Sequence, residues 1–408
     1  MIIVCGRNSP VSGRFGPQTV ILAIRHLQRD PVQDLSVTPT EPKVDRVQRQ
    51  GDLTHGLTLA RLPGVLDHAL GQTGTAQTGT VILLSRTETQ SLLDLDALRE
   101  ALSEAMQDVS ARRVSMPPRI AATVPSHGLL AAMPAYSPSS GLATKLVSVY
   151  PGNAGTPLPS HQAVVVVFDP ETGEPLALLD GTSITTLRTA AGSALSAQLL
   201  ARSDAETLAI LGTGVQARAH AEAMLRVRPI RRIRVAGRNR ERAAALAGDL
   251  QETLGLEAQA VDSYADACAG ADLVCAATHT VDPVVHRRYL SPGVHVTSVG
   301  FNPDGREVDS ATVADALVVV ESVEAVLAPP PAGCNDLRVP IDEGLIGPEH
   351  IRTEIGELLL GTKPGRTSPD QITLYKSVGV AAQDVAAAHL ALSLARARGL
   401  GTTVDLSV

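Results

Sequence analysis

Residues 208–239 read LAILGTGVQARAHAEAMLRVRPIRRIRVAGRN, and this stretch decides the fold of the chain. Its first four residues, 208–211, are apolar and predict a short buried strand. A glycine turn follows, and the spacing of the apolar residues over 216–227 predicts an amphipathic helix. Residues 233–236 supply the next strand. The order strand, turn, helix, strand is that of a β-α-β unit with a parallel sheet.

The turn carries the glycine pattern of a dinucleotide-binding unit. Gly212 lets the chain turn sharply off the strand, Gly214 leaves the backbone open to a pyrophosphate, and Ala217 allows close packing of helix and strand. Backbone N–H groups at the start of the helix then face the phosphates. The alternative is a glycine turn in an ordinary β-α-β unit. The residues expected along the pyrophosphate are Gly212, Thr213, Gly214, Val215 and Gln216.

The end of the second strand indicates which dinucleotide is bound. A free ribose diol is usually held by Asp or Glu at that point, whereas a 2′-phosphate calls for arginine. This chain has Gly237, Arg238, Asn239 and Arg240 there. Because guanidinium groups match phosphate geometry, we expect Arg238 and Asn239 to bind the cofactor, with NADP(H) preferred and NAD(H) possible. The alternative is that both arginines are solvated residues at the start of a helix.

Composition bounds the class of protein. With 408 residues, a net charge of -7 and no Trp, we expect two domains with cores of Ala, Leu and Val, and no nucleic-acid partner. The four cysteines form no C-x-x-C pair, which fits reduced thiols in a cytoplasm. No apolar run is long enough for a membrane span and the start lacks a signal-peptide core, so we expect a soluble, cytoplasmic protein. The 11 histidines show no ligand spacing, and no metal is expected.

Residues 1–79 differ from the rest of the chain. They show no sustained hydrophobic periodicity and end in the low-complexity run 71–80, so we expect a poorly structured N-terminal extension. One hypothesis is that this segment is an upstream over-translation and that the working protein begins near Val81. Because no Met lies between Met1 and Met106, that start would need a valine-type codon.

From residue 80 the hydrophobic pattern becomes regular. The strands expected first are 81–84, 120–124, 142–149, 163–168 and 175–179, with helices at 95–109 and 184–201. Around the dinucleotide unit we expect further strands at 273–276, 294–299 and 317–320, with helices at 240–254 and 263–269. Five alternating strands predict a doubly wound parallel sheet.

A proline run at 329–331 marks a crossing between domains. Helices expected at 351–360 and 381–398 follow it and return to the first domain. We therefore predict an α/β protein in which a Rossmann domain, residues 201–329, is inserted into a second, α+β domain made of residues 80–200 plus 330–408.

With these residues in view, the chain resembles the ornithine cyclodeaminase/mu-crystallin family from about Val81 to Leu394. The motifs that carry the resemblance are Met133-Pro-Ala, Lys145 with Pro151-Gly-Asn153, His161-Gln-Ala, Asp169-Pro-x-Thr-Gly, Leu187-Arg-Thr-Ala-Ala191, Gly212-x-Gly-x-Gln-Ala217, Gly361-x-Lys-Pro-Gly-Arg366, and Lys376-Ser-Val-Gly379 with Asp384. The resemblance implies a nicotinamide cofactor that acts on small amino or imino acids. It also implies a homodimer, in which the α+β domains bind the substrate and pair across the two-fold axis.

The resemblance also places the substrate. Arg119, Lys145 and Arg188 match the positions that hold the substrate carboxylate in this family. A bidentate arginine would fix that carboxylate so that C2 faces the nicotinamide. Arg188 lies in an Ala-rich helix and needs a ligand or partner if buried, whereas Lys145 on its strand can be merely exposed. Ser377 and Gly379 match the family's segment near the nicotinamide and are further cofactor candidates.

Three other positions carry smaller expectations. Thr278 follows a predicted strand and falls at the carboxyl end of the sheet, where ligands bind, so we expect it to contact the cofactor. His161 is the one histidine within a matched motif that merits a test, its alternative being a hydrogen-bonded structural histidine. Arg306 and Glu307 are expected to neutralise each other.

The most informative departure from the family lies in residues 299–307. Cyclodeaminases carry an acidic residue where this chain has Asn302, and they use it for proton transfer. Asn cannot titrate and so cannot be a general base, although Asp304 can occupy the acidic position if the loop is shifted. Imine reduction does not need this acidic residue, because Lys145 can supply the proton. The candidate catalytic residues are Lys145, Asn302 and Asp304.

These observations support three hypotheses. The first is an NAD(P)H-dependent reductase of small imino acids, of the ketimine, pyrroline- or piperideine-2-carboxylate type, which transfers a hydride to C2 and gives the amino acid. The second is an NAD-dependent ornithine cyclodeaminase that converts ornithine to proline and ammonia and needs the acid that Asn302 replaces. The third is a non-catalytic NADP(H)-dependent binding protein.

Overall fold

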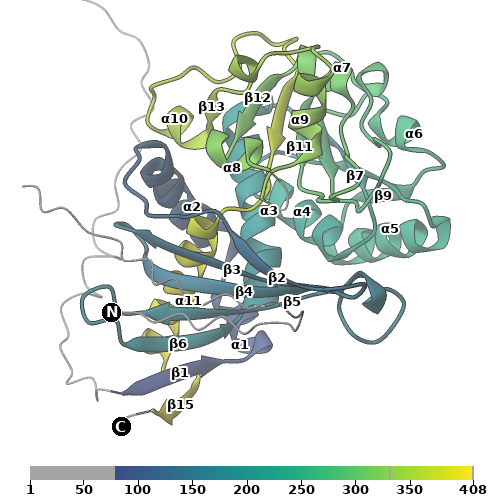
Figure 1. Cartoon of the computed structure of the whole chain (residues 1–408). Helices are drawn as coiled ribbons and strands as arrows, with labels where there is room; N and C mark the ends of the chain where they lie inside the picture. The colour runs from purple at the N-terminus through teal and green to yellow at the C-terminus, as the bar shows by residue number, and fades with distance from the viewer. Residues whose placement is uncertain (1–78, 330–331, 407–408) are drawn as a thin grey trace, which may run out of the picture. The chain divides into compact units, whose positions relative to one another are not determined.

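A computed structural model describes residues 79–329 and 332–406 of the chain. The extension expected over 1–79 falls on residues that, apart from Gly79, lie outside the described part of the chain. Two sheets organise the described residues, one of seven strands and one of eight (Figure 1).

The seven-stranded sheet has the order β15-β1-β6-β5-β4-β3-β2. The strand β1 runs parallel to β6, and the other neighbouring pairs are antiparallel. Of these strands, β3 and β15 were not predicted, and Pro134 interrupts the apolar pattern of β3. The strands are β1 (Thr80–Leu84), β2 (Ile120–Val124), β3 (Gly128–Ser137), β4 (Gly141–Val149), β5 (His161–Phe168), β6 (Pro175–Asp180) and β15 (Thr402–Asp405).

Helices α2 (Leu95–Ser110), α3 (Gly181–Leu200) and α11 (Ala381–Arg398) pack together against one face of this sheet (Figure 1). Apolar residues at three- and four-residue spacing explain α2, because Leu98, Leu102 and Met106 on that stripe are all fully buried. Asp94 begins the helix by accepting hydrogen bonds from the backbone N–H groups of its first turn. The short helices α1 (Arg86–Leu92) and η1 (Pro151–Asn153) complete this region.

The eight-stranded sheet is parallel throughout and has the order β13-β12-β14-β11-β10-β7-β8-β9. The strand order reverses between β7 and β10, as in a doubly wound dinucleotide fold, so the predicted fold class is confirmed. Its strands are β7 (Thr207–Leu211), β8 (Arg232–Ala236), β9 (Glu257–Ala260), β10 (Leu273–Ala276), β11 (His295–Ser298), β12 (Leu317–Val320), β13 (Thr353–Glu354) and β14 (Thr373–Lys376). Its helical segments are α4 (Val215–Leu225), α5 (Arg240–Leu254), α6 (Tyr264–Cys268), η2 (Arg287–Tyr289), α7 (Ser310–Asp315), α8 (Val323–Leu327), α9 (Asn335–Asp342), η3 (Pro348–His350) and α10 (Ile355–Leu359).

The chain after residue 330 is divided between the two sheets, which corrects its assignment to the first domain alone. The strands β13 and β14 extend the parallel sheet, whereas β15 joins the seven-stranded sheet and α11 packs against it. The helix expected over 351–360 was also placed too early, because β13 occupies its start and only α10 is helical. The strand β14 escaped prediction because it is only four residues long and ends in a lysine, although all four residues are buried.

None of the described helices is long and apolar enough to cross a membrane. Cys268, Cys275 and Cys334 are buried free thiols. Within the described ranges, no group of His, Cys, Asp and Glu side chains is arranged to hold a metal ion.

Helix α3 connects the two sheets through buried histidines. Ser193 on α3 lies 2.9 Å from Nε2 of His220 on α4, and His220 Nδ1 donates to the carbonyl of Gln216. One turn along α3, Ser196 lies 3.1 Å from Nε2 of His295 on β11. Burial lowers the pKa of His220 to about 4 and that of His295 to about 3, so both imidazoles are neutral in the folded protein.

These neutral histidines predict acid sensitivity. Because the folded pKa of His220 is depressed, its contribution to stability is complete above the unfolded value of 6.5 and is lost as the pH falls toward 4. By pH 5 the loss amounts to about 2 kcal/mol in the free energy of unfolding. Denaturant unfolding at pH 7 and pH 5 measures it, and the His220→Gln variant should lose correspondingly less on acidification. Equal pH dependence in both proteins would contradict the assignment.

Candidate active site

The glycine turn after β7 has the geometry that a dinucleotide requires. Gly212 has φ +121°, and a Cβ there would collide with the carbonyl of Ala277. At Gly214 an added Cβ meets no described atom within 4 Å, so the backbone is open on the ligand side. Gly214 precedes the first turn of α4, which no side chain caps. The residues present therefore fit a bound pyrophosphate at this helix N-terminus.

The residues after β8 separate into different roles. Asn239 caps α5, accepting a hydrogen bond of 2.8 Å from the backbone N–H of Arg242. Arg240 forms an exposed ion pair with Asp262 at 2.7 Å, so a carboxylate lies at this edge of the sheet. Arg238 is exposed beside them. Among the described contacts, Arg240 forms an ion pair, whereas Arg238 forms none.

A group of charged side chains lies between the seven-stranded sheet and the helices that pack against it. Asp384 on α11 forms ion pairs with Lys145 on β4 at 2.7 Å and with Arg188 on α3 at 3.1 Å. Arg188 also donates to the side-chain oxygen of Gln383. Residues alternate between the two faces of β4, and Lys145 lies on the face that the helices cover. Lys145 and Arg188 are only 3% and 5% exposed, so the alternative of a merely exposed lysine is wrong.

In this group, burial and the ion pairs with Asp384 shift the pKa values in opposite directions. Desolvation, with Arg188 and Arg119 nearby, lowers the pKa of Lys145 to about 8, although Asp384 acts in the other direction. For Asp384, burial is outweighed by Lys145 and Arg188, which hold its pKa below the usual value. Asp384 therefore stays ionised and neutralises one of the two cations. The sequence placed Asp384 in a matched motif but gave it no role, because its partners are far away in the chain.

Arg119, in the loop before β2, lies beside the same group of charges. Its guanidinium donates to the carbonyls of Val378 at 3.0 Å and Gly379 at 2.9 Å. Gly379 has φ +71°, and a Cβ there would collide with Arg188. The segment after β14 is thus held between two arginines. A cavity of about 110 Å³ opens beside Arg119, with Met116, Met133, Ala325 and Gly379 among its walls.

Glu321, which sequence reasoning missed, fixes that segment from the end of β12. Its buried carboxylate accepts hydrogen bonds from the Ser377 hydroxyl at 2.6 Å and from the backbone N–H groups of Val378 and Gly379. Glu321 follows an apolar strand directly, and an acid in that position at a carboxyl strand end is the signal that could have identified it. The predicted cofactor residues Ser377 and Gly379 therefore lie beside the predicted substrate residues.

The loop 299–307 gives its candidate residues structural partners. Asn302 donates to the carbonyl of Thr280 at 2.9 Å and accepts from the backbone N–H of Asp304 at 3.0 Å. The Asp304 side chain is exposed. Neither residue contacts Lys145 or Arg188 in the described structure, so their catalytic roles stay predictions.

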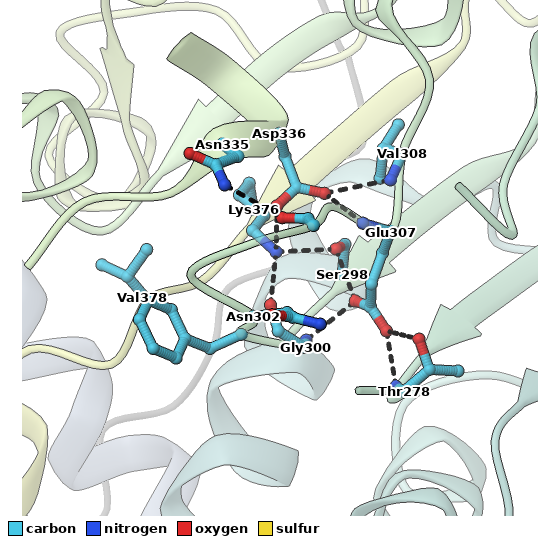
Figure 2. A network of polar contacts seen from close by, with 12 residues as sticks. Thr278, Ser298, Gly300, Asn302, Glu307, Val308, Asn335, Asp336, Lys376 and Val378 are labelled. Carbon is cyan, nitrogen blue, oxygen red and sulfur yellow. Dashed lines mark hydrogen bonds and ion pairs between the residues drawn. The ribbon is translucent and has the colours of Figure 1, made fainter. Parts of the chain in front are cut away.

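Glu307 corrects another expectation, because it does not pair with Arg306. Its carboxylate accepts hydrogen bonds from Thr278, Ser298 and Gly300 (Figure 2). Arg306 instead contacts Ser310 and Glu343. The expected pair fails because successive residues leave the chain in different directions, and here only Glu307 points inward. Thr278, a predicted cofactor residue, is held by this carboxylate.

His161 lies at the start of β5 near the buried charges. Burial, with Lys145 and Arg188 close by, lowers its pKa to about 4, so its imidazole is neutral at pH 7. A neutral imidazole can accept or donate a hydrogen bond beside the cations without adding a further positive charge.

Comparisons with known proteins show the family to which the chain belongs. The model of the ornithine cyclodeaminase/mu-crystallin family matches residues 80–397. The chain belongs to this family. It is 35% identical over 329 residues to the delta(1)-pyrroline-2-carboxylate reductase of Bacillus cereus, covering 80% of this chain and 100% of the relative.

Two further members extend the family comparison. The ketimine reductase mu-crystallin of Mus musculus is 36% identical, over 68% of this chain and 84% of its own. The structure of Thermococcus litoralis delta(1)-pyrroline-2-carboxylate reductase in complex with NADH and L-proline has a TM-score of 0.76 and 38% identity, covering 79% of this chain and 100% of that one. By their names, these relatives are reductases of delta(1)-pyrroline-2-carboxylate or of ketimines.

Proposed function

We propose that this chain is an NAD(P)H-dependent reductase of small imino acids of the pyrroline- or piperideine-2-carboxylate type. The observation that carries the proposal is the buried charge group beside the segment 377–379. Arg119, Lys145 and Arg188 supply three positive charges, and Asp384 and Glu321 supply two negative ones. The excess of one positive charge matches one substrate carboxylate. Relatives that this chain matches along their full length reduce such imines.

The arginines would bind and orient the substrate. Arg188 uses Nε and one terminal nitrogen for Asp384 and Gln383, and Arg119 uses one terminal nitrogen for two backbone carbonyls. Their remaining N–H groups, which make no hydrogen bond within the described residues, can hold a carboxylate. Asp384 fixes the plane of the Arg188 guanidinium and so sets the direction in which the substrate is held.

Lys145 would supply the proton. A cyclic imine accepts a hydride at C2 more readily when its nitrogen is protonated, and an ammonium with a pKa of about 8 is protonated at pH 7 yet acidic enough to donate. The apolar side chains of Met116 and Met133 in the adjoining cavity suit a small hydrocarbon ring. NAD(P)H, when bound along Gly212 to Gln216 and beside Thr278, supplies the hydride.

The cyclodeaminase reaction lacks the group it needs. Its general base would have to come from Asn302, which cannot titrate and whose amide is engaged with Thr280, or from the exposed Asp304. Nothing in the loop favours ammonia elimination over imine reduction.

We expect the purified protein to oxidise NADPH when given a cyclic 2-imino acid, and to release no proline or ammonia from ornithine with NAD. Cofactor absorbance and a proline assay measure the two reactions. Proline from ornithine without net cofactor change would show that another group transfers the proton, and Asp304 would be the first candidate. Cofactor binding without any turnover would favour the non-catalytic binding protein.

The Arg188→Lys variant tests the carboxylate site within the same assay. Because a point charge cannot reproduce a planar fork, KM for the imino acid should rise by about tenfold or more. The dissociation constant of NADPH should change far less than KM and serves as the control. Unchanged KM would place the carboxylate elsewhere.

We further propose that NADP(H) is preferred and that Arg238 is the residue responsible. Replacing Arg238 by Ala should weaken NADPH binding by about tenfold and leave NADH binding nearly unchanged, because only NADPH carries the 2′-phosphate. Arg240→Ala is the matched control, since the Arg240 guanidinium is engaged with Asp262. Titration calorimetry measures both cofactors, and equal losses for NADPH and NADH in Arg238→Ala would remove the reason to prefer NADP(H).

We also propose a homodimer formed through the outer face of the seven-stranded sheet. The register of the strands places Ile120, Leu130 and Val164 on the face opposite Lys145, and they are 71%, 49% and 39% exposed. Light scattering should give about twice the chain mass of 42.5 kDa. Val164→Lys should shift the protein toward monomer, whereas Leu345→Lys, at an exposed leucine outside this sheet, should not. A monomeric wild-type protein would contradict the proposal.

A further inference from the structure

A buried carboxylate supports the ends of two neighbouring strands of the parallel sheet. One oxygen of Glu307 accepts hydrogen bonds from the backbone N–H and hydroxyl of Thr278, directly after β10. The other accepts from the hydroxyl of Ser298, which ends β11, at 2.7 Å, and from the backbone N–H of Gly300 at 2.8 Å. Glu307 is only 2% exposed. All four donors are neutral, so none of them cancels the negative charge.

This support lies beside the glycine turn. The methyl carbon of Thr278 is 3.4 Å from the position that a Cβ on Gly212 would take, so Thr278 forms one side of the crevice where the strand order reverses. Ligands of such sheets bind in that crevice, outside the carboxyl ends of the strands. Glu307 therefore fixes the position of a wall of the dinucleotide site without itself facing it.

A lysine and an aspartate stand behind Glu307 (Figure 2). Lys376 on β14 forms an ion pair with Asp336 on α9 at 3.0 Å and donates to the Ser298 hydroxyl and to the carbonyl of Gly300. Asp336 in turn accepts from the backbone N–H groups of Glu307 and Val308. Although burial opposes its charge, Asp336 and Glu307 raise the pKa of Lys376 to about 12.

The charges of Lys376, Asp336 and Glu307 do not cancel. One positive charge on Lys376 faces two carboxylates, Asp336 and Glu307, which leaves one negative charge next to the crevice. The nicotinamide ring is positively charged when oxidised and neutral when reduced. A buried negative charge nearby interacts favourably with the oxidised ring only, and the interaction is stronger away from water.

We propose that Glu307 is a positioning residue for the nicotinamide cofactor, holding the ends of β10 and β11 in place and favouring the oxidised over the reduced cofactor through its uncompensated charge. This inference rests on the proposed function, since it concerns the cofactor of that reaction. The bias assists hydride donation, because the ring acquires its positive charge as the hydride leaves.

The test is the ratio of two dissociation constants, that of NADP⁺ divided by that of NADPH, measured by titration calorimetry without substrate. In Glu307→Gln the negative charge is removed at nearly constant shape, so binding of NADP⁺ should weaken more and the ratio should rise about fivefold. A merely structural support would weaken both forms equally and leave the ratio unchanged. That result would overturn the proposal.

Two more variants sharpen the measurement. Asp336→Asn also removes one negative charge, but at a residue that does not contact Thr278, so the ratio should rise here too. This variant provides the test if Glu307→Gln does not fold. Glu343→Gln removes a carboxylate that pairs with Arg306 in the same loop but is 47% exposed, so its ratio should stay at the wild-type value. An unchanged ratio in Asp336→Asn would overturn the charge argument. Failure of the wild-type chain to bind NADP⁺, NADPH, NAD⁺ and NADH alike would instead contradict the proposed function, and this inference with it.

Discussion

The ion pairs of Asp384 with Lys145 and Arg188 are the constraint on which the proposed substrate site depends. They join α11, β4 and α3, three elements that are far apart in the chain. A buried cation without a partner would cost several kcal/mol, so this carboxylate stabilises both Lys145 and Arg188 inside the fold. The same bonds fix the direction of the Arg188 guanidinium. The interaction that permits two buried cations therefore also sets the geometry in which they can bind an anion.

The charges on the two sides of the site are of opposite sign. Around segment 377–379, three cations face two carboxylates, whereas behind Thr278 one lysine faces two carboxylates. A substrate carboxylate suits the first group and a positively charged nicotinamide suits the second. Because each imbalance is a single unit in a buried place, a ligand of the matching charge stabilises it more than water can. These two imbalances are the basis on which we propose a carboxylate substrate for the first group and a nicotinamide cofactor beside the second.

Helix α9 shows how the fold secures a loop that carries little regular structure. Asn335 donates to the carbonyls of Pro303 and Gly305, and Asp336 accepts from the backbone of Glu307 and Val308. These contacts satisfy backbone groups that would otherwise lack partners near the core. Helix α9 therefore holds the second half of the loop 299–307, and the outward residues Phe301 and Asp304 remain exposed.

The sequence by itself determined the dinucleotide fold, because Gly212, Gly214 and Ala217 act through local backbone geometry that a short stretch encodes. It also pointed to Arg119, Lys145 and Arg188, but only through a family resemblance, and their substrate roles stay predictions. Only the tertiary structure decided their partners, since Asp384 and Glu321 come from strands and helices far away in the chain. It likewise decided that Glu307 faces Thr278 rather than Arg306. Long-range pairing of buried charges depends on how the elements pack, and no local pattern of residues records it.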